Sequence, residues 1–208
     1  MNKKILIICR GGGDLATGIV HRLFRAGFQV LVLETDSPAA IRRQVSFSEA
    51  VYDGTATVEG VTAERIASAD RASVDHVLEA GRVPLLVDPE GNSIAQLKPD
   101  IVVDAIIAKK NLGTAKEMAP LVIGVGPGFT AGEDVDLVVE SMRGHNLARI
   151  FTTGSALPNT GIPGNIGGFT KERVLHAEAD GYMKNIRKIG NIVEKGEEIA
   201  RIYEKMTE

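Results

Sequence analysis

The sequence of 208 residues has no tryptophan, a single cysteine and only 4% aromatic residues. Because Cys9 has no partner, disulfide bonds within the chain and cysteine-rich zinc or iron–sulfur sites are excluded, and we predict no metal site. The scarcity of aromatic side chains argues against a platform on which nucleic-acid bases stack. Low cysteine content is typical of the reducing cytoplasm, which is the location we expect.

The sequence also lacks a large excess of charge of either sign and long hydrophobic runs. Lys and Arg number 24 against 27 for Asp and Glu, a net charge of -3, and no basic stripe is interleaved with aromatic residues. We therefore expect no nucleic-acid partner. The apolar run that follows Lys3-Lys4 is too short for a signal peptide or a membrane-spanning helix, so we expect no membrane partner.

Glycine, by contrast, is concentrated in a turn from Cys9 to Gly18. Residues 3–9 before the turn are typical of a strand buried on both faces. Residues 15–24 after it carry apolar residues at helical spacing, and residues 29–33 form a second apolar run that ends on Glu34. This order predicts a dinucleotide-binding unit within an α/β fold, a Rossmann-like doubly wound parallel sheet with a small C-terminal β unit.

Each position of the turn has an expected role. Gly11 allows the tight turn, Gly13 lets the backbone approach a pyrophosphate, and Ala16 permits close packing of helix on strand. The helix N-terminus favours an anion, and Glu34 is placed to accept hydrogen bonds from a ribose diol and to repel a 2′-phosphate. We expect Asp14 to be the N-cap of the helix. The predicted binding residues of this unit are Gly11, Gly12, Gly13, Asp14, Leu15, Ala16 and Glu34. The alternative is a glycine turn that only packs a βαβ unit.

Charged residues beyond later strands are further candidates. Arg42 and Arg43 either hold a phosphate or form a solvated helix face. Asp104 follows a buried run at residues 100–103, at the strand end that lines the ligand crevice in parallel sheets. Together with Lys109 it either grips a phosphate or carboxylate, or caps the strand before a solvated loop.

A second glycine-rich loop follows the apolar run at residues 121–125. Gly126 and Gly128 form either a backbone cradle for an anion or an ordinary turn. His145 is the strongest histidine candidate for a site. The sequence has no HExxH, GxSxG or Walker motif, and the catalytic residues stay unknown.

Composition predicts three parts: a Rossmann-like nucleotide-binding domain at 1–155, a linker or functional loop at 156–170, and a partial β unit at 171–208. Residues 61–78 carry two short helical patterns. Residues 173–177 and 180–183 are expected to be short strands, and residues 189–202 alternate with the period of a strand.

The tail from Ala179 to Ala200 resembles the first half of a biotinyl/lipoyl-like hammerhead. No Met-Lys-Met hairpin with an attachment lysine is present, so the resemblance does not imply that biotin or lipoate is carried. The second half is missing, so we expect either that the chain is truncated before the small barrel closes or that the barrel closes with another chain, an arrangement that suits a homodimer.

Across nearly its whole length the sequence resembles the accessory-protein family of the selenium-dependent molybdenum hydroxylase system. The segments that carry the resemblance are Arg10 to Gly18, Ile41 to Arg43, Val103 to Ala105, Gly126 to Phe129, Arg143 to His145 and Asn159 to Gly161. More distantly it resembles the xanthine dehydrogenase accessory factors, which handle the molybdenum cofactor before its insertion. The resemblance implies a maturation role, a nucleotide or molybdopterin-type cofactor as ligand, and a molybdenum hydroxylase subunit as partner.

Three functional hypotheses follow. We prefer a nucleotide-binding accessory protein that binds or hands over molybdenum cofactor. The second is an NAD-dependent dehydrogenase of a small anionic or tetrapyrrole-like substrate, because the glycine turn also resembles that of precorrin dehydrogenases. The third is a Rossmann scaffold without catalytic activity. The sequence leaves open whether the protein is an enzyme.

Overall fold

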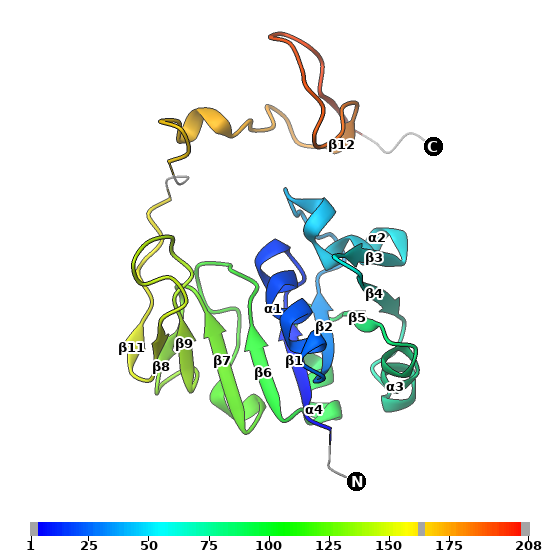
Figure 1. The fold of residues 1–208 in the computed structure, drawn as a ribbon, viewed down its shortest axis with the longest axis vertical. Coiled ribbons are helices and arrows are strands. Elements are labelled where there is room, and N and C mark those ends of the chain that lie inside the picture. Colours follow the sequence, from blue (N-terminus) through cyan, green and yellow to red (C-terminus); the bar gives the residue numbers. More distant parts are fainter. Residues whose placement is uncertain (1–3, 162–164, 205–208) are drawn as a thin grey trace. The chain divides into compact units, whose positions relative to one another are not determined.

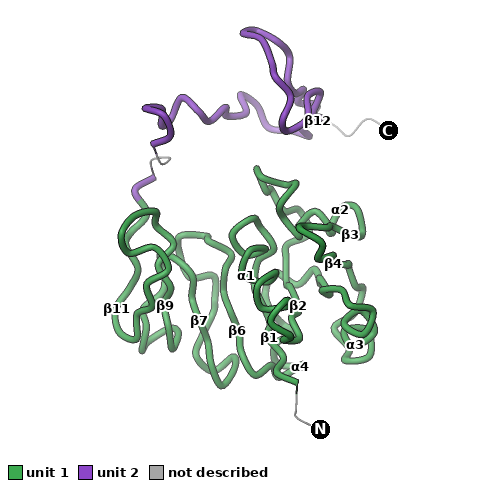
Figure 2. Tube along the Cα trace, viewed as in Figure 1, with its two compact units in different colours: residues 1–159 green, residues 160–208 purple. Residues whose placement is uncertain are grey.

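A computed structural model describes residues 4–161 and 165–204, and the chain divides into two compact units, Met1–Asn159 and Thr160–Glu208 (Figure 2). The division falls inside the stretch 156–170 that composition singled out. Lys3 of the first predicted strand and Pro163-Gly164 of that stretch lie outside the described residues. In the part of the chain that the structure describes, no helix is long and apolar enough to cross a membrane.

The first unit is built on a nine-stranded sheet in the order β10-β9-β7-β6-β1-β2-β5-β4-β3 (Figure 1). Its strands from β9 to β4 run parallel, and only the outermost strands β10 and β3 are antiparallel to their neighbours. The strands are β1 (Leu6–Arg10), β2 (Gln29–Glu34), β3 (Thr55–Val58), β4 (Val61–Ile66), β5 (Val83–Val87), β6 (Ile101–Asp104), β7 (Leu121–Val125), β9 (Leu137–Val139) and β10 (Ile150–Phe151). β8 (Thr130–Ala131) and β11 (Gly154–Ser155) form a separate two-stranded sheet.

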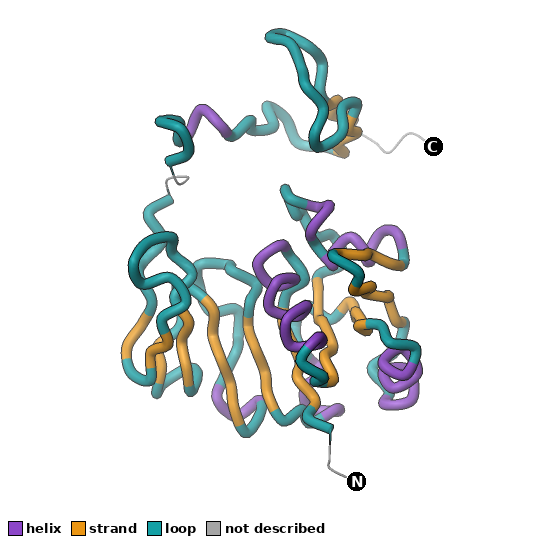
Figure 3. Tube along the Cα trace, in the orientation of Figure 1, coloured by secondary structure: helices purple, strands orange, loops and turns teal. Residues whose placement is uncertain are grey.

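Helices cover both faces of the large sheet (Figure 3). They are α1 (Asp14–Arg25), α2 (Ala50–Asp53), α3 (Arg71–Glu79) and α4 (Asn92–Leu97), with short 3-10 helices at Arg43–Val45, Phe47–Glu49 and Lys116–Met118. Ile7 and Cys9 of β1 pack in the core on the side of α1 and α2, whereas Ile8 packs in the core on the side of α3 and α4. Because successive residues are buried on opposite faces of the sheet, β1 is apolar from Leu6 to Cys9 and only its last residue, Arg10, is charged. The predicted α/β, Rossmann-like fold is confirmed.

The prediction of two helical patterns over residues 61–78 is wrong for its first half. Val61–Ile66 is β4, which pairs in parallel with β5, with Ala63 opposite Val83. Val61 and Ala63 are buried in the core on the side of α1 and α2, a tertiary contact that local spacing does not reveal. The second half is helix α3, whose N-cap Asp70 accepts a hydrogen bond from the backbone N–H of Ser73 at 2.8 Å.

In the second unit, an antiparallel hairpin joins β12 (Tyr182–Asn185) to β13 (Ala200–Tyr203). The strand predicted at residues 173–177 is not formed, since a 3-10 helix at Lys171–Arg173 is followed by loop. Of the alternating stretch 189–202, only its end is a strand. Alternation alone does not make a strand where no neighbouring strand is available for pairing.

Candidate functional site

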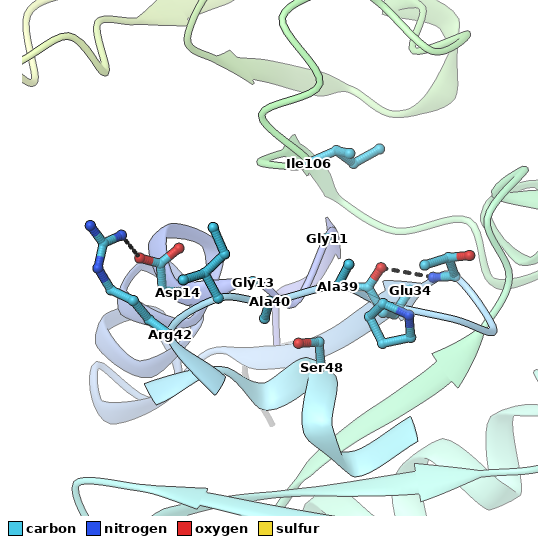
Figure 4. Close-up of a pocket in the computed structure, with 12 residues that line it drawn as sticks. Gly11, Gly13, Asp14, Glu34, Ala39, Ala40, Arg42, Ser48 and Ile106 are labelled. Atoms are coloured by element: carbon cyan, nitrogen blue, oxygen red, sulfur yellow. Dashed lines mark hydrogen bonds and ion pairs between the residues drawn. The ribbon is translucent and has the colours of Figure 1, made fainter. Parts of the chain in front are cut away.

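The cavity of greatest chemical interest lies where the strand order reverses, beside the carboxyl ends of β1 and β6. Within the sheet, β1 has β2 as its neighbour on one side and β6 as its neighbour on the other. The chain passes from β1 to β2 first and returns to β6 later. Open α/β sheets bind their ligands at this switch point. The cavity has a volume of about 350 Å³ and is lined by Gly11, Gly13, Asp14, Glu34, Thr35, Pro38, Ala39, Ala40, Ile41, Arg42, Ser48 and Ile106 (Figure 4).

Gly11 and Gly12 fold the turn between β1 and α1 tightly onto its surroundings. Gly11 has φ +98°, and a Cβ at this position would lie 2.9 Å from the Cα of Ile106. Only glycine therefore lets the turn pass so close to the loop after β6. The Gly12 carbonyl accepts hydrogen bonds from Thr17 Oγ1 at 3.0 Å and from the backbone N–H of Ser48 at 2.8 Å.

Gly13 leaves open space at the N-terminus of α1. It is the N-cap, with φ -64°, and apart from its two chain neighbours no described residue comes within 4 Å of the position that a Cβ would occupy. The first intrahelical bond of α1 runs from the N–H of Thr17 to the Gly13 carbonyl, and no side chain of the described residues caps the helix. The N–H groups of the first turn, at residues 14–16, thus remain available for an anion.

Asp14 and Leu15 differ from their predicted roles. Asp14 is the first helical residue and not the N-cap, and its carboxylate pairs with Arg42 across 2.6 Å. Leu15 is 51% exposed and does not line the cavity, although the sequence predicts it both on the apolar face of the helix and among the binding residues. Ala16 is buried against the sheet, which fits the close packing expected of it.

Glu34, the last residue of β2, is fixed by the turn that it faces. Its Oε2 accepts a hydrogen bond from the Gly12 N–H and its Oε1 accepts one from the Thr35 N–H, both at 2.8 Å. A carboxylate oxygen accepts two hydrogen bonds, so each oxygen retains a free acceptor position. This arrangement suits the two neighbouring hydroxyls of a ribose.

The remaining wall of the cavity comes from the segment after β2. Residues 38–41 supply an apolar surface, and Arg42 follows them with its guanidinium paired to Asp14 (Figure 4). Arg43 begins the next 3-10 helix and does not line the cavity.

Ser48 is a site residue that sequence reasoning missed. Its side chain is fully buried, lines the cavity, and has no hydrogen-bond partner for its hydroxyl among the described residues. It lies 30 residues or more from the glycine turn in sequence, in a short 3-10 helix (Phe47–Glu49) without any recognisable motif. Only the fold brings it beneath Gly12.

Asp104 has a structural position and not the ligand-facing one predicted for it. Its side chain is 2% exposed. It accepts hydrogen bonds from Thr114 Oγ1 at 2.6 Å and from the N–H of Ile106 at 3.1 Å, and its Oδ2 lies 3.6 Å from Nη1 of the buried Arg10. The carboxylate therefore holds the loop after β6 and does not point into the cavity.

The other predicted binding residues lie elsewhere. Positions beside Gly126 and Gly128 are filled, because a Cβ would lie 2.7 Å from Ser141 Oγ and from the Lys110 Cα, respectively. The loops thus pack closely against both glycines, and neither glycine lines the cavity. Lys109 and His145 are exposed and do not line the cavity.

Cys9 lies next to the turn but is closed off from it. Its side chain is fully buried and its thiol points to the Gly11 carbonyl, 3.7 Å away. Burial raises the pKa of the Cys9 thiol far above its ordinary value, and the charges of Asp104 and Glu34 raise it further. The thiol is therefore protonated and unreactive in the folded state.

The chain is similar to an uncharacterized protein of Escherichia coli strain K12, YqeB. The two are 48% identical over 199 residues, which is 96% of this chain and 36% of the relative. The chain thus spans just over a third of the length of the curated relative that it matches. No family model and no solved structure matches the sequence.

Proposed function

We propose that the first unit binds a nucleotide, with its phosphates at the N-terminus of α1 and its ribose at Glu34. One observation carries the proposal: the open space at Gly13, the uncapped first turn of α1 and the anchored carboxylate of Glu34 border the same cavity at the switch point of the sheet. The apolar residues 38–41 provide the surface against which a base or pterin would pack.

In the cell we assign this binding to the maturation of a selenium-dependent molybdenum hydroxylase, as the resemblance of the sequence to the accessory family of that system implies. The ligand is then a dinucleotide or a molybdopterin-type cofactor that carries a phosphate or nucleotide, and the partner is a hydroxylase subunit. Both classes of ligand bring the anion that the α1 N-terminus favours.

The lining of the cavity favours binding and transfer of a cofactor over a dehydrogenase reaction. Among the described residues that line it, the ionisable side chains are Asp14, Glu34 and Arg42, and none is a His, Lys, Tyr or Cys. Asp14 and Arg42 are paired with each other, and Glu34 is held by two backbone N–H groups. The cavity thus offers no evident proton donor for reduction of a carbonyl or imine.

A thermal-shift panel with NAD, NADP, ATP, CTP and a molybdopterin preparation tests the proposal. A ligand at about one hundred times its dissociation constant stabilises the fold by about 2.7 kcal/mol. Stabilisation by molybdopterin or CTP supports the accessory role. Stabilisation by NAD alone, followed by hydride transfer, would favour the dehydrogenase. No shift with any ligand would refute nucleotide binding and favour the scaffold.

A further inference from the structure

We propose that Arg42 and Ser48 form the phosphate-binding subsite of this cavity, and that Asp14 holds Arg42 until the phosphate of the ligand displaces it. The proposal rests on the proposed function, because it assumes that a phosphate-bearing ligand enters the cavity. It goes beyond that function because it assigns Arg42 and Ser48 to phosphate binding and Asp14 to competition with the phosphate for Arg42.

Asp14 occupies a position that suits the anion of a ligand. It is the first residue of α1, where the helix dipole favours negative charge, and its Oδ2 lies 2.6 Å from Nη1 of Arg42. Figure 4 shows this pair at one end of the cavity, with the Arg42 side chain reaching from the segment after β2 to the start of the helix. In the free protein the carboxylate of Asp14 therefore neutralises a guanidinium that would otherwise be free to bind a phosphate.

The ion pair between Asp14 and Arg42 is exposed enough for a phosphate to replace Asp14 as the partner of Arg42. The Arg42 side chain is 62% exposed and that of Asp14 is 31% exposed. Ion pairs at such exposure contribute little to stability, so breaking this one costs little. A phosphate carries more charge than a carboxylate and presents oxygens to both Arg42 and the N–H groups of α1, so it competes well for the guanidinium.

Ser48 supplies independent evidence that a ligand acceptor belongs in this cavity. Its hydroxyl is buried and unpartnered among the described residues, although a buried hydroxyl without a hydrogen bond is unfavourable. The backbone N–H of Ser48 donates to the Gly12 carbonyl at 2.8 Å, so the residue is held directly against the glycine turn. A phosphate oxygen above Gly13 would provide the missing acceptor.

Substitutions of the three residues should change the affinity for phosphates in different directions. Replacing Arg42 by Ala removes an attraction and weakens binding of phosphates. Replacing Asp14 by Asn removes a competing and repelling charge and strengthens it. Replacing Ser48 by Ala removes one donor and weakens it, but should leave the melting temperature unchanged because the hydroxyl has no partner to lose.

We would test this by NMR titration of the full chain with inorganic pyrophosphate, ADP and adenosine. ADP and adenosine differ only in the diphosphate. Arg42→Ala should weaken ADP binding about 10- to 100-fold, and Ser48→Ala about 3- to 10-fold, with adenosine binding unchanged. Asp14→Asn should strengthen ADP and pyrophosphate binding by about 3-fold or more.

Matched controls exist for each type of change. Arg82→Ala breaks an exposed ion pair of the same length, between Arg82 and Glu64 at 2.6 Å, away from the cavity. Ser93→Ala removes a hydroxyl that is buried in α4 and does not line the cavity. Neither control should change ADP binding.

The outcomes separate the two proposals. A wild-type chain that binds none of the three probes would contradict the proposed function together with this inference. A wild-type chain that binds ADP, with Arg42→Ala binding it equally well, would overturn the inference and leave the nucleotide site standing. Weaker ADP binding by Asp14→Asn would show that Asp14 supports the ligand and does not compete with it.

Discussion

Gly11 and Gly13 border the same cavity, yet the structure predicts opposite effects for their substitution. Gly13 is the N-cap of α1, with φ -64° and empty space in the direction of a Cβ. Aspartate is a better N-cap than glycine by a few tenths of a kcal/mol, and its charge suits the helix dipole. We therefore expect Gly13→Asp to leave stability unchanged or raise it by about 0.5 kcal/mol, a melting-temperature rise of about 1–2 °C.

Ligand binding should nevertheless be lost in Gly13→Asp. The new carboxylate would lie where the phosphate approaches, and two like charges about 4–5 Å apart repel by about 3–4 kcal/mol at the effective dielectric constant of a protein surface. That energy corresponds to a loss of affinity of at least about 100-fold. Gly11→Ala should instead destabilise the fold by about 2–4 kcal/mol, because φ is +98° and the new Cβ would meet the Ile106 Cα at 2.9 Å.

Urea denaturation measures the stability of the Gly13→Asp and Gly11→Ala variants, and nucleotide titration measures their affinity for the ligand. Gly18→Ala is the control, since Gly18 lies on the exposed face of α1 with no atom within 4 Å of a new Cβ. It should stabilise the helix by about 0.5–1 kcal/mol and leave binding unchanged. A stable Gly13→Asp protein that still binds nucleotide would refute phosphate binding at this turn. A fully stable Gly11→Ala protein would refute the argument from close approach.

Two further predictions concern ionisable groups. Since burial raises the pKa of the Cys9 thiol, we expect thiol reagents to modify Cys9 only after unfolding, and rapid labelling of the native protein would contradict its enclosure. Hydrogen bonds from the Ser73 hydroxyl and backbone N–H lower the pKa of Asp70 to about 2. A lowered pKa stabilises the fold above the ordinary carboxyl pKa, so the stability of the wild type relative to Asp70→Asn should shrink as pH falls from about 4 towards 2. A pH-independent difference between the two proteins would disprove the role of that cap.

The sequence predicted the part of the site whose residues lie close together in the chain. The apolar period of β1, the spacing of α1 and the acid at the end of β2 all lie within residues 5–34, and the structure places Gly11, Gly13 and Glu34 around one cavity. Strand and helix periods are set by neighbouring residues, so they can be recognised without the fold.

The other half of the site depends on contacts that are distant in sequence. Ser48 reaches the turn through its N–H bond to Gly12, and Asp104 turns away from the cavity because Thr114 and Arg10 hold it. A charged residue after a strand has the same sequence signature whether it faces a ligand or a buried arginine. Only the three-dimensional packing distinguishes the two cases, which is why the sequence leaves two alternatives open for each of Asp104, Gly126 and Gly128.

Arg10 explains how these distant contacts shape the binding cavity. It is the last residue of β1, is 2% exposed, and donates hydrogen bonds to the carbonyls of Pro89 and Leu112 and to the Thr114 hydroxyl. One side chain thus joins the end of β1 to the loops that follow β5 and β6. A buried charge of this kind adds little net stability but requires one arrangement of its partners. The loop after β6 carries Ile106, which lines the cavity opposite the segment that bears Arg42. By holding this loop, the buried Arg10 fixes the wall of the cavity that faces that segment.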